Sequence, residues 1–191
     1  MGKKIRGFEV VKQEHRTLPD EVIKLPVRGT QTSAGYDFFA TQDLLIKPQE
    51  KVIFKTDVKA YMGADEVLLI DVRSSIGSKK DLMITNTLGV IDSDYYENVD
   101  NDGNMMVGLR NLKPAISIKG FVKVVDIKGM LWDVPLVEDL TEENTVIIKA
   151  GERVAQGIFV KYLEADNGNT KNKRTGGTGS TDKSTGGQNN G

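Results

Sequence analysis

The residues best suited to chemistry are two aspartates, Asp92 and Asp94, which follow an apolar run and lie two positions apart. Residues i and i+2 of a β-strand lie on one face, so we expect both carboxylates to point the same way, with Ser93 on the other face. One carboxylate could act as a general base toward a water molecule, and the ring of Tyr95 suits packing against a sugar or base. The alternative is a surface hairpin whose acidic turn is simply solvated.

A second candidate group follows the apolar run 66–72, which predicts a buried strand. Arg73 at its end offers a fork of donors to phosphate oxygens, and Ser74 and Ser75 add hydroxyl and backbone N–H groups. A short helix over 76–81 would add a favourable dipole for an anion. Alone, such a triplet is more often a helix cap.

Composition removes several classes of function. The 191 residues include no cysteine and one histidine, which excludes a cysteine nucleophile, a thiolate metal site and a multi-histidine metal site. A metal would be bound by oxygen, which favours magnesium or calcium. The net charge of −1 argues against direct nucleic-acid binding. No apolar run reaches the roughly 20 residues of a membrane helix, and no signal peptide is apparent, so we expect a cytoplasmic protein without a membrane partner.

Many short alternating segments separated by Gly, Pro, Asn and Asp turns predict an all-β fold. One strand is expected over 51–62. Residues 112–143 alternate on both sides of a turn at 128–129 and predict an inserted hairpin-like module. Residues 166–191 contain no apolar side chain, so we expect a flexible arm. The predicted organisation is a β-domain over 1–165, including the insertion, followed by this arm.

Five segments, in order, resemble the motifs of the homotrimeric dUTP pyrophosphatases (dUTPases). They are Ala34-Gly35-Tyr36-Asp37, Arg73-Ser74-Ser75, Gly89-Val90-Ile91-Asp92-Ser93-Asp94-Tyr95, Gly151-Glu152-Arg153-Val154-Ala155-Gln156 and Gly176-Gly177-Thr178-Gly179-Ser180-Thr181. The resemblance implies a distorted jelly-roll β-barrel and a homotrimer whose active sites each draw on several subunits. Family members encoded by bacteriophages are similar in carrying an insertion before the fourth motif, which would place the protein in the host cytoplasm.

The resemblance also implies magnesium-dependent hydrolysis of dUTP to dUMP and pyrophosphate. Asp92 would be the general base for water attack on the α-phosphorus, shielded from bulk water by Val90 and Ile91, with Arg73 and Gln156 also catalytic. Asp37 would hold magnesium through water, with the substrate phosphates as direct ligands. The implied substrate-binding residues are Ser74, Ser75, Asn86, Asp92, Tyr95, Met106, Arg153, Arg174, Gly176, Gly177, Gly179 and Ser180.

Three features depart from the family pattern or need explanation. Thr178 stands where the family has a phenylalanine that stacks on uracil. The hairpin tip over 96–103 is longer and more acidic, which leaves the uracil contacts open. Arg153 and Gln156 are three residues apart and would not share a regular strand face, so we expect a turn to present them.

The resemblance leaves two further functions open, because some relatives encoded by bacteriophages bind a repressor protein and others of this fold deaminate dCTP. The chain could be chiefly a nucleotide-switched protein-binding module, or combine the enzyme with binding of a repressor protein through residues 112–143. Trp132 would anchor that partner, unless it packs on the barrel as a brace. The other further function is that of a dCTP deaminase of the same fold, which would release ammonia rather than pyrophosphate.

Overall fold

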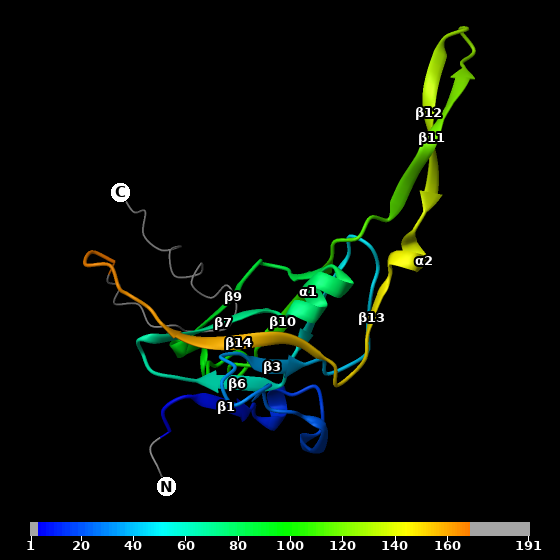
Figure 1. The fold of residues 1–191 in the computed structure, drawn as a ribbon. Coiled ribbons are helices and arrows are strands. Elements are labelled where there is room, and N and C mark those ends of the chain that lie inside the picture. The colour runs from blue at the N-terminus through cyan, green and yellow to red at the C-terminus, as the bar shows by residue number, and fades with distance from the viewer. Residues whose placement is uncertain (1–3, 169–191) are drawn as a thin grey trace, which may run out of the picture.

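A computed structural model describes residues 4–168 of the chain, and strands dominate its regular structure. The predicted all-β fold is confirmed. The largest sheet has five strands in the order β2-β3-β14-β7-β9. Its members are β2 (Val27–Arg28), β3 (Tyr36–Phe39), β14 (Arg153–Lys161), β7 (Glu66–Val72) and β9 (Gly89–Asp92). This sheet brings the first, second and fourth motifs onto neighbouring strands (Figure 1).

The remaining described strands form smaller sheets. A three-stranded sheet has the order β5-β10-β8, and three two-stranded sheets are β1-β6, β13-β4 and β11-β12. Their bounds are β1 (Gly7–Val10), β4 (Leu44–Ile46), β5 (Lys51–Lys55), β6 (Val58–Tyr61), β8 (Leu82–Ile84), β10 (Met106–Asn111), β11 (Ile116–Val125), β12 (Leu131–Asp139) and β13 (Val146–Ile148). The pairings among the described strands do not close into a ring, so the jelly-roll-type fold is an open arrangement of sheets around one apolar core.

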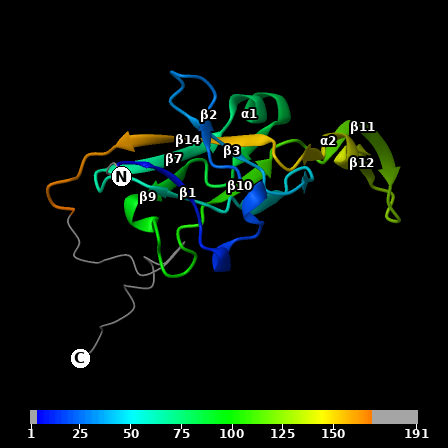
Figure 2. The same ribbon diagram turned by 90° about the horizontal axis from the view of Figure 1, so that it is seen from below.

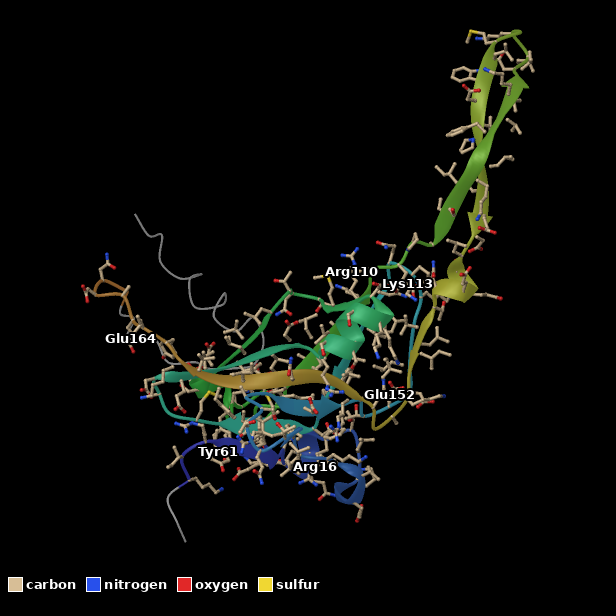
Figure 3. The ribbon with its side chains drawn as sticks, viewed as in Figure 1. Arg16, Tyr61, Arg110, Lys113, Glu152 and Glu164 are labelled. Carbon is tan, nitrogen blue, oxygen red and sulfur yellow. The ribbon has the colours of Figure 1, made fainter. Side chains whose placement is uncertain are left out.

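The core draws on almost every sheet. Leu68 of β7, Leu109 of β10, Ile148 of β13 and Val154 of β14 are fully buried. The continuous apolar run of β7 is explained by its position between β14 and β9, which leaves little of the strand in contact with water. Glu152 and Glu164 lie before and after β14, the longest strand of this sheet (Figure 3).

The single strand expected over 51–62 is wrong, because the chain turns a corner at Asp57. This residue has φ of +57°, and β5 on one side pairs with β10 while β6 on the other pairs with β1. The Asp57 carboxylate accepts hydrogen bonds from the backbone N–H groups of Thr17 and Leu18, both at 2.9 Å. Alternation of apolar residues continues across the corner, so periodicity alone cannot reveal it.

The helical segments are short. They are the 3-10 turns η1 (Gln13–His15), η2 (Asp20–Val22) and η3 (Ser93–Tyr95) and the α-helices α1 (Ser74–Lys80) and α2 (Thr141–Asn144). Helix α1 is fixed to the core by Ile76, which is 3% exposed. Within residues 4–168, no helix has the length and apolar character needed to cross a membrane.

Strands β11 and β12 form the predicted inserted hairpin, which projects away from the rest of the described chain (Figures 1 and 2). Its turn contains Gly129 with φ of +81°. Trp132 is 54% exposed, and its indole N–H donates to the Asp126 carboxylate within the hairpin at 3.0 Å. Trp132 therefore does not brace the core sheets. The hairpin ends return together, since the Leu140 N–H donates to the Ala115 carbonyl at 2.8 Å.

Candidate active site

The first part of the candidate site is a buried aspartate held by two arginines, one directly after β7 and one at the start of β14. Asp37 of β3 is 5% exposed. Its Oδ1 forms an ion pair with Arg73 Nε at 2.9 Å, and its Oδ2 accepts a hydrogen bond from Arg153 Nη1 at 3.2 Å. Because β14 lies between β3 and β7, residues from three predicted motifs meet here. Each guanidinium keeps further N–H groups with which it could bind an anion.

A β-bulge in β14 brings Arg153 and Gln156 onto one face. The pairing with β3 shifts between Arg153 and Ala155, so Val154 is an extra residue. Val154 and Ala155 are consecutive and both 0% exposed. The alternation of buried and exposed side chains along β14 therefore shifts by one residue at this point. The expectation that a turn presents Arg153 and Gln156 is wrong, because both lie within β14 and the bulge aligns them.

Gln156 lies directly opposite Asp37 in the register of β14 and β3. A Cβ added at Gly35 would lie 2.6 Å from Gln156 Oε1. Glycine at position 35 is therefore what allows this side chain to lie close to the backbone before β3. The sequence motif thus has a steric explanation in addition to its resemblance to a family.

Ser74 and Ser75 form the first turn of α1, with Arg73 as the N-cap residue. The helix begins two residues before the predicted segment 76–81. The first N–H groups of an α-helix have no partner within the helix, so these serines present backbone donors beside the arginine pair. Their hydroxyl groups add further hydrogen-bonding capacity.

The second part of the site is a pocket of about 420 Å³, a size typical of small-molecule sites. Four predicted substrate-binding residues line it, namely Asn86, Asp92, Tyr95 and Met106. The rest of the lining comes from apolar residues of β5, β7, β8, β9 and β10, from Thr85, and from Gly89 and Gly108. The pocket therefore combines an apolar floor with a few polar groups, as small-molecule sites usually do.

Two expectations about the aspartates are wrong. Strand β9 ends at Asp92, and Ser93 begins η3, so Asp94 lies beyond the strand and does not share a strand face with Asp92. Asp94 is also not among the residues that line the pocket. Asp92 is exposed in the described chain and Val90 is 54% exposed, so Val90 and Ile91 do not shield the carboxylate from water.

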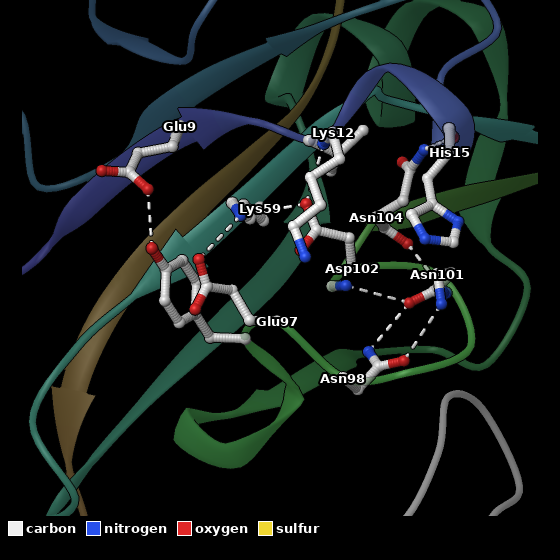
Figure 4. A network of polar contacts seen from close by, with 12 residues as sticks. Glu9, Lys12, His15, Lys59, Glu97, Asn98, Asn101, Asp102 and Asn104 are labelled. Carbon is white, nitrogen blue, oxygen red and sulfur yellow. Dashed lines mark hydrogen bonds and ion pairs between the residues drawn. The ribbon is translucent and has the colours of Figure 1, made fainter.

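Sequence reasoning missed the residues that hold Tyr95. Its hydroxyl donates to the Asn104 carbonyl at 3.2 Å and accepts from Asn101 Nδ2 at 2.7 Å. These asparagines belong to a polar network that also contains Lys59 and Asp102 (Figure 4). The available signal was a run of asparagine and aspartate ending in Asp102-Gly103, which is typical of a tightly hydrogen-bonded turn.

Asp92 and Arg73 are well separated within one chain. Strands β7 and β9 are antiparallel, with Asp92 opposite Val67, and Arg73 lies six residues further along β7. At about 3.3 Å per residue, roughly 20 Å of strand separates the two positions. A single chain therefore does not bring the arginine pair to Asp92, although the pocket extends along β7 as far as Ile70.

The described residues contain no group of three or more His, Asp or Glu side chains that could hold a metal ion. Both oxygens of Asp37 are already paired with an arginine nitrogen. Each carboxylate oxygen can accept a further hydrogen bond, so the residues fit a water-mediated contact to a phosphate-bound ion and do not fit a direct metal cage.

The predicted arm residues lie outside the described part of the chain. They are Arg174, Gly176, Gly177, Thr178, Gly179 and Ser180.

Comparison with known proteins gives consistent matches. Residues 21–124 match the dUTPase family model. A deoxyuridine 5'-triphosphate nucleotidohydrolase of Lactococcus lactis is 40% identical over 180 residues, covering 93% of this chain and 98% of the relative. The dUTPase of Streptococcus mutans is 34% identical with a TM-score of 0.61, covering 84% of this chain and 99% of that one. The dUTPase of phage phi11 of S. aureus, described with a structural Mg(II) ion, is 26% identical with a TM-score of 0.58, covering 88% and 98%.

Proposed function

The chain belongs to the dUTPase family, and from this membership we propose that it hydrolyses dUTP to dUMP and pyrophosphate. The observation that carries the proposal is the pairing of buried Asp37 with Arg73 and Arg153, on strands that bring three family motifs together. A cationic pair fixed by a buried carboxylate is prepared to bind a phosphate chain before the substrate arrives. The separate pocket lined by Asp92 and Tyr95 would take the nucleoside.

In this proposal Asp92 accepts a proton from a water molecule whose oxygen attacks the α-phosphorus. The bond between the α-phosphorus and the oxygen that bridges to the β-phosphorus breaks, and pyrophosphate leaves. Arg73 and Arg153, with the N–H groups at the start of α1, stabilise charge on the phosphate oxygens. Gln156 lies opposite Asp37 in the adjacent strand, where its amide can orient a phosphate oxygen or the attacking water.

A magnesium ion, when bound, neutralises charge on the phosphates that serve as its direct ligands. Asp37 contacts its water shell in this proposal. Because Asp37 also holds both arginines, the same carboxylate would set the position of the cations and of the hydrated metal.

We propose a homotrimer in which one subunit supplies the Asp92 pocket and another supplies Arg73 and Arg153. Roughly 20 Å of strand between Asp92 and Arg73 supports this arrangement. An interface would also cover the exposed Val90 and shield Asp92, which the isolated chain leaves in contact with water. We further propose that residues 1–165 form the β-domain and that 166–191 form an arm whose Arg174 and glycines close over the phosphates.

The inserted hairpin supports a second proposed role in binding a protein such as a repressor. Both faces of the β11–β12 hairpin carry exposed apolar side chains, among them Phe121, Val124, Trp132 and Leu136. An isolated two-stranded hairpin is marginally stable in water, and apolar patches of this kind mark interaction sites. A partner protein would cover them, with Trp132 as the central anchor.

The test is incubation of the full chain with a panel of deoxyribonucleoside and ribonucleoside triphosphates, with and without magnesium, and identification of the products. The expected result is release of pyrophosphate and dUMP from dUTP, and more slowly or not at all from the other nucleotides. Release of ammonia from dCTP would instead assign the chain to the deaminase alternative. Turnover of no nucleotide would leave protein binding as its main role.

A further inference from the structure

We propose that Asn101 is a positioning residue for substrate selection: it holds the ring of Tyr95 in place and thereby contributes to the preference for deoxyribose over ribose. The proposal rests on the proposed dUTPase function and concerns the loop 96–104, which lies between Tyr95 and β10. In this inference the loop has a role in specificity and is not a passive insertion.

The contact that carries the inference joins Asn101 to the hydroxyl of Tyr95. Tyr95 lines the nucleotide pocket and is 7% exposed. Its hydroxyl accepts from Asn101 Nδ2 at 2.7 Å and donates to the Asn104 carbonyl at 3.2 Å. The far end of the ring is therefore fixed by one donor and one acceptor, both supplied by the loop.

The amide of Asn101 is itself held in a single orientation. Its Oδ1 accepts from the backbone N–H of Gly103 at 3.0 Å and from Asn98 Nδ2 at 2.8 Å (Figure 4). The N–H of Gly103 can only donate, so the atom facing it must be the amide oxygen. This leaves the Asn101 NH₂ group directed to Tyr95, and the backbone thus determines which group the tyrosine meets.

The loop is anchored to the body of the chain by a buried ion pair. Lys59 Nζ lies 2.9 Å from Asp102 Oδ2, and the two side chains are 5% and 1% exposed. The backbone N–H of Lys12 donates to the same carboxylate oxygen at 2.8 Å. The loop is therefore tied to β6 and to the N-terminal segment, so its position does not depend on a bound nucleotide.

Two more contacts fix the loop against Tyr95. A Cβ added at Gly103 would lie 2.9 Å from the Tyr95 carbonyl oxygen, and Gly103 has φ of +81°, so this close approach requires glycine. Asn104 is fully buried, and its amide bonds to both the backbone and the carboxylate of Asp57 at 3.0 Å. The carbonyl that accepts from Tyr95 thus belongs to a residue with no freedom to move.

A ring fixed in this way can exclude a ribose 2′-hydroxyl, because it cannot move away from the added oxygen. If the ring were free at its hydroxyl end, a small displacement would make room. Steric rejection of one extra hydroxyl by an apolar surface is worth about 10²-fold at most. Loss of the Asn101 contact should therefore remove a part of this discrimination, about tenfold.

The experiment compares kcat/KM for dUTP with that for UTP in the full chain and in Asn101→Ala. We expect the dUTP-to-UTP ratio to fall about tenfold. Asn101→Asp is the second variant, because it keeps the oxygen that accepts from Gly103 and Asn98 while removing the NH₂ donor, and it should also lower the ratio. Val99→Ser, at an exposed position of the same loop (78% exposed), is the matched control and should keep the ratio.

A double-mutant cycle with Tyr95→Phe separates positioning from a general loss of structure. If Asn101 acts through the tyrosine hydroxyl, Asn101→Ala should cause no further fall in the ratio when position 95 is phenylalanine. An unchanged ratio in both Asn101 variants, or an equal fall with and without the hydroxyl, would overturn the proposal. A wild-type chain that does not turn over dUTP would instead overturn the proposed function on which it rests.

Discussion

Arg73 and Asp37, 36 residues apart in sequence, meet through an ion pair of 2.9 Å between Nε and Oδ1. The carboxylate is buried, whereas the Arg73 side chain is 33% exposed. The ion pair therefore uses Nε and leaves the two terminal nitrogens of the guanidinium for other partners. Arg153 approaches the other carboxylate oxygen at 3.2 Å. This arrangement makes Asp37 the residue on which the geometry of the phosphate-binding part depends.

The first prediction is that Asp37→Asn lowers kcat/KM for dUTP by ~10² or more, the scale seen when one preorganised electrostatic contact is removed. Both arginines would lose their charged partner and their fixed direction. Thermal unfolding should also occur at lower temperature, because two cations would remain beside a neutral buried group. Pyrophosphate release and a melting curve measure the two effects.

Asp65→Asn is the matched control for this experiment. Asp65 pairs with Lys161, and the two side chains are 59% and 73% exposed. Exposed pairs contribute little to stability, so activity and melting should stay close to those of the wild type. If Asp37→Asn were equally silent, the cluster would have no part in catalysis.

The second prediction concerns Asp92. Asp92→Asn keeps the shape of the side chain and removes the base, so turnover should fall by at least ~10²-fold while nucleotide binding is largely kept. Asp94→Asn is the comparison, because Asp94 lies in η3 and does not line the pocket, and its effect should be much smaller. Near-normal turnover by Asp92→Asn would rule out its assignment as the base.

The third prediction concerns the arm. Deleting residues 166–191 removes no apolar side chain, so the melting temperature should barely change, whereas dUTP hydrolysis should collapse. A shorter deletion of 182–191 keeps Arg174 and the glycine-rich segment 176–181 and should preserve activity. Wild-type activity of the chain that lacks 166–191 would show that the arm is only a linker.

The fourth prediction is a pH dependence of stability from Asp102. Burial opposes its charged form, but hydrogen bonds from the Lys12 amide and the Lys59 ammonium outweigh this and hold its pKa below the ordinary value of 3.8. Since the folded-state pKa is the lower one, the stability is fully present above the unfolded-state pKa and is lost as pH falls through the folded-state pKa. The difference in urea unfolding free energy between wild type and Asp102→Asn should therefore shrink from pH 5 toward pH 3. A difference that stays constant over this range would contradict the linkage.

Features that depend on residue type could be predicted from the sequence. Features that depend on which strands pair, and in which register, could not. The apolar run of β7 predicted a strand that is largely buried, as the structure has it, whereas the anion-binding role of the arginine after it stays a prediction. Periodicity could not reveal the bulge at Val154, because the bulge is defined by its partner strand. Periodicity also could not reveal that β9 ends at Asp92. The turn after this strand places Tyr95 beside Asn101, a contact that only the fold determines.

The network of the loop 96–104 was beyond a sequence argument for a different reason. Lys59 and Asp102 are 43 residues apart, and a charged pair in sequence is usually solvated. Only the fold shows that both side chains are buried and face each other. The asparagines indicate a turn, but their contact with Tyr95 requires the three-dimensional arrangement.

The last prediction concerns the inserted hairpin and Trp132. The ends of the insertion lie together, because Asn111 Nδ2 donates to the Asn144 carbonyl at 2.8 Å and the Leu140 N–H to the Ala115 carbonyl. Since loop closure costs only about 0.6 kcal/mol per doubling of length, exchanging residues 116–139 for a short turn should leave a folded, active enzyme. Residues 112–115 and 140–143 are kept, because the carbonyls of 112 and 113 accept from Gln49, that of 114 accepts from Asn144, and 115 and 140 bond to each other.

Protein partnership is what this deletion should remove, and Trp132→Ala tests the same point with one side chain. Trp132 is 54% exposed and bonds only within the hairpin among the described residues, so its truncation should leave the melting temperature and dUTP turnover unchanged. Capture of a partner should weaken, because an aromatic anchor buried on binding can contribute ~2 kcal/mol or more. Val125→Ala, at an exposed position near the same turn, is the control for a general loss of apolar surface and should weaken capture less. If Trp132→Ala and the hairpin deletion both captured as much partner protein as the wild type, the hairpin would have no role in recognising that partner.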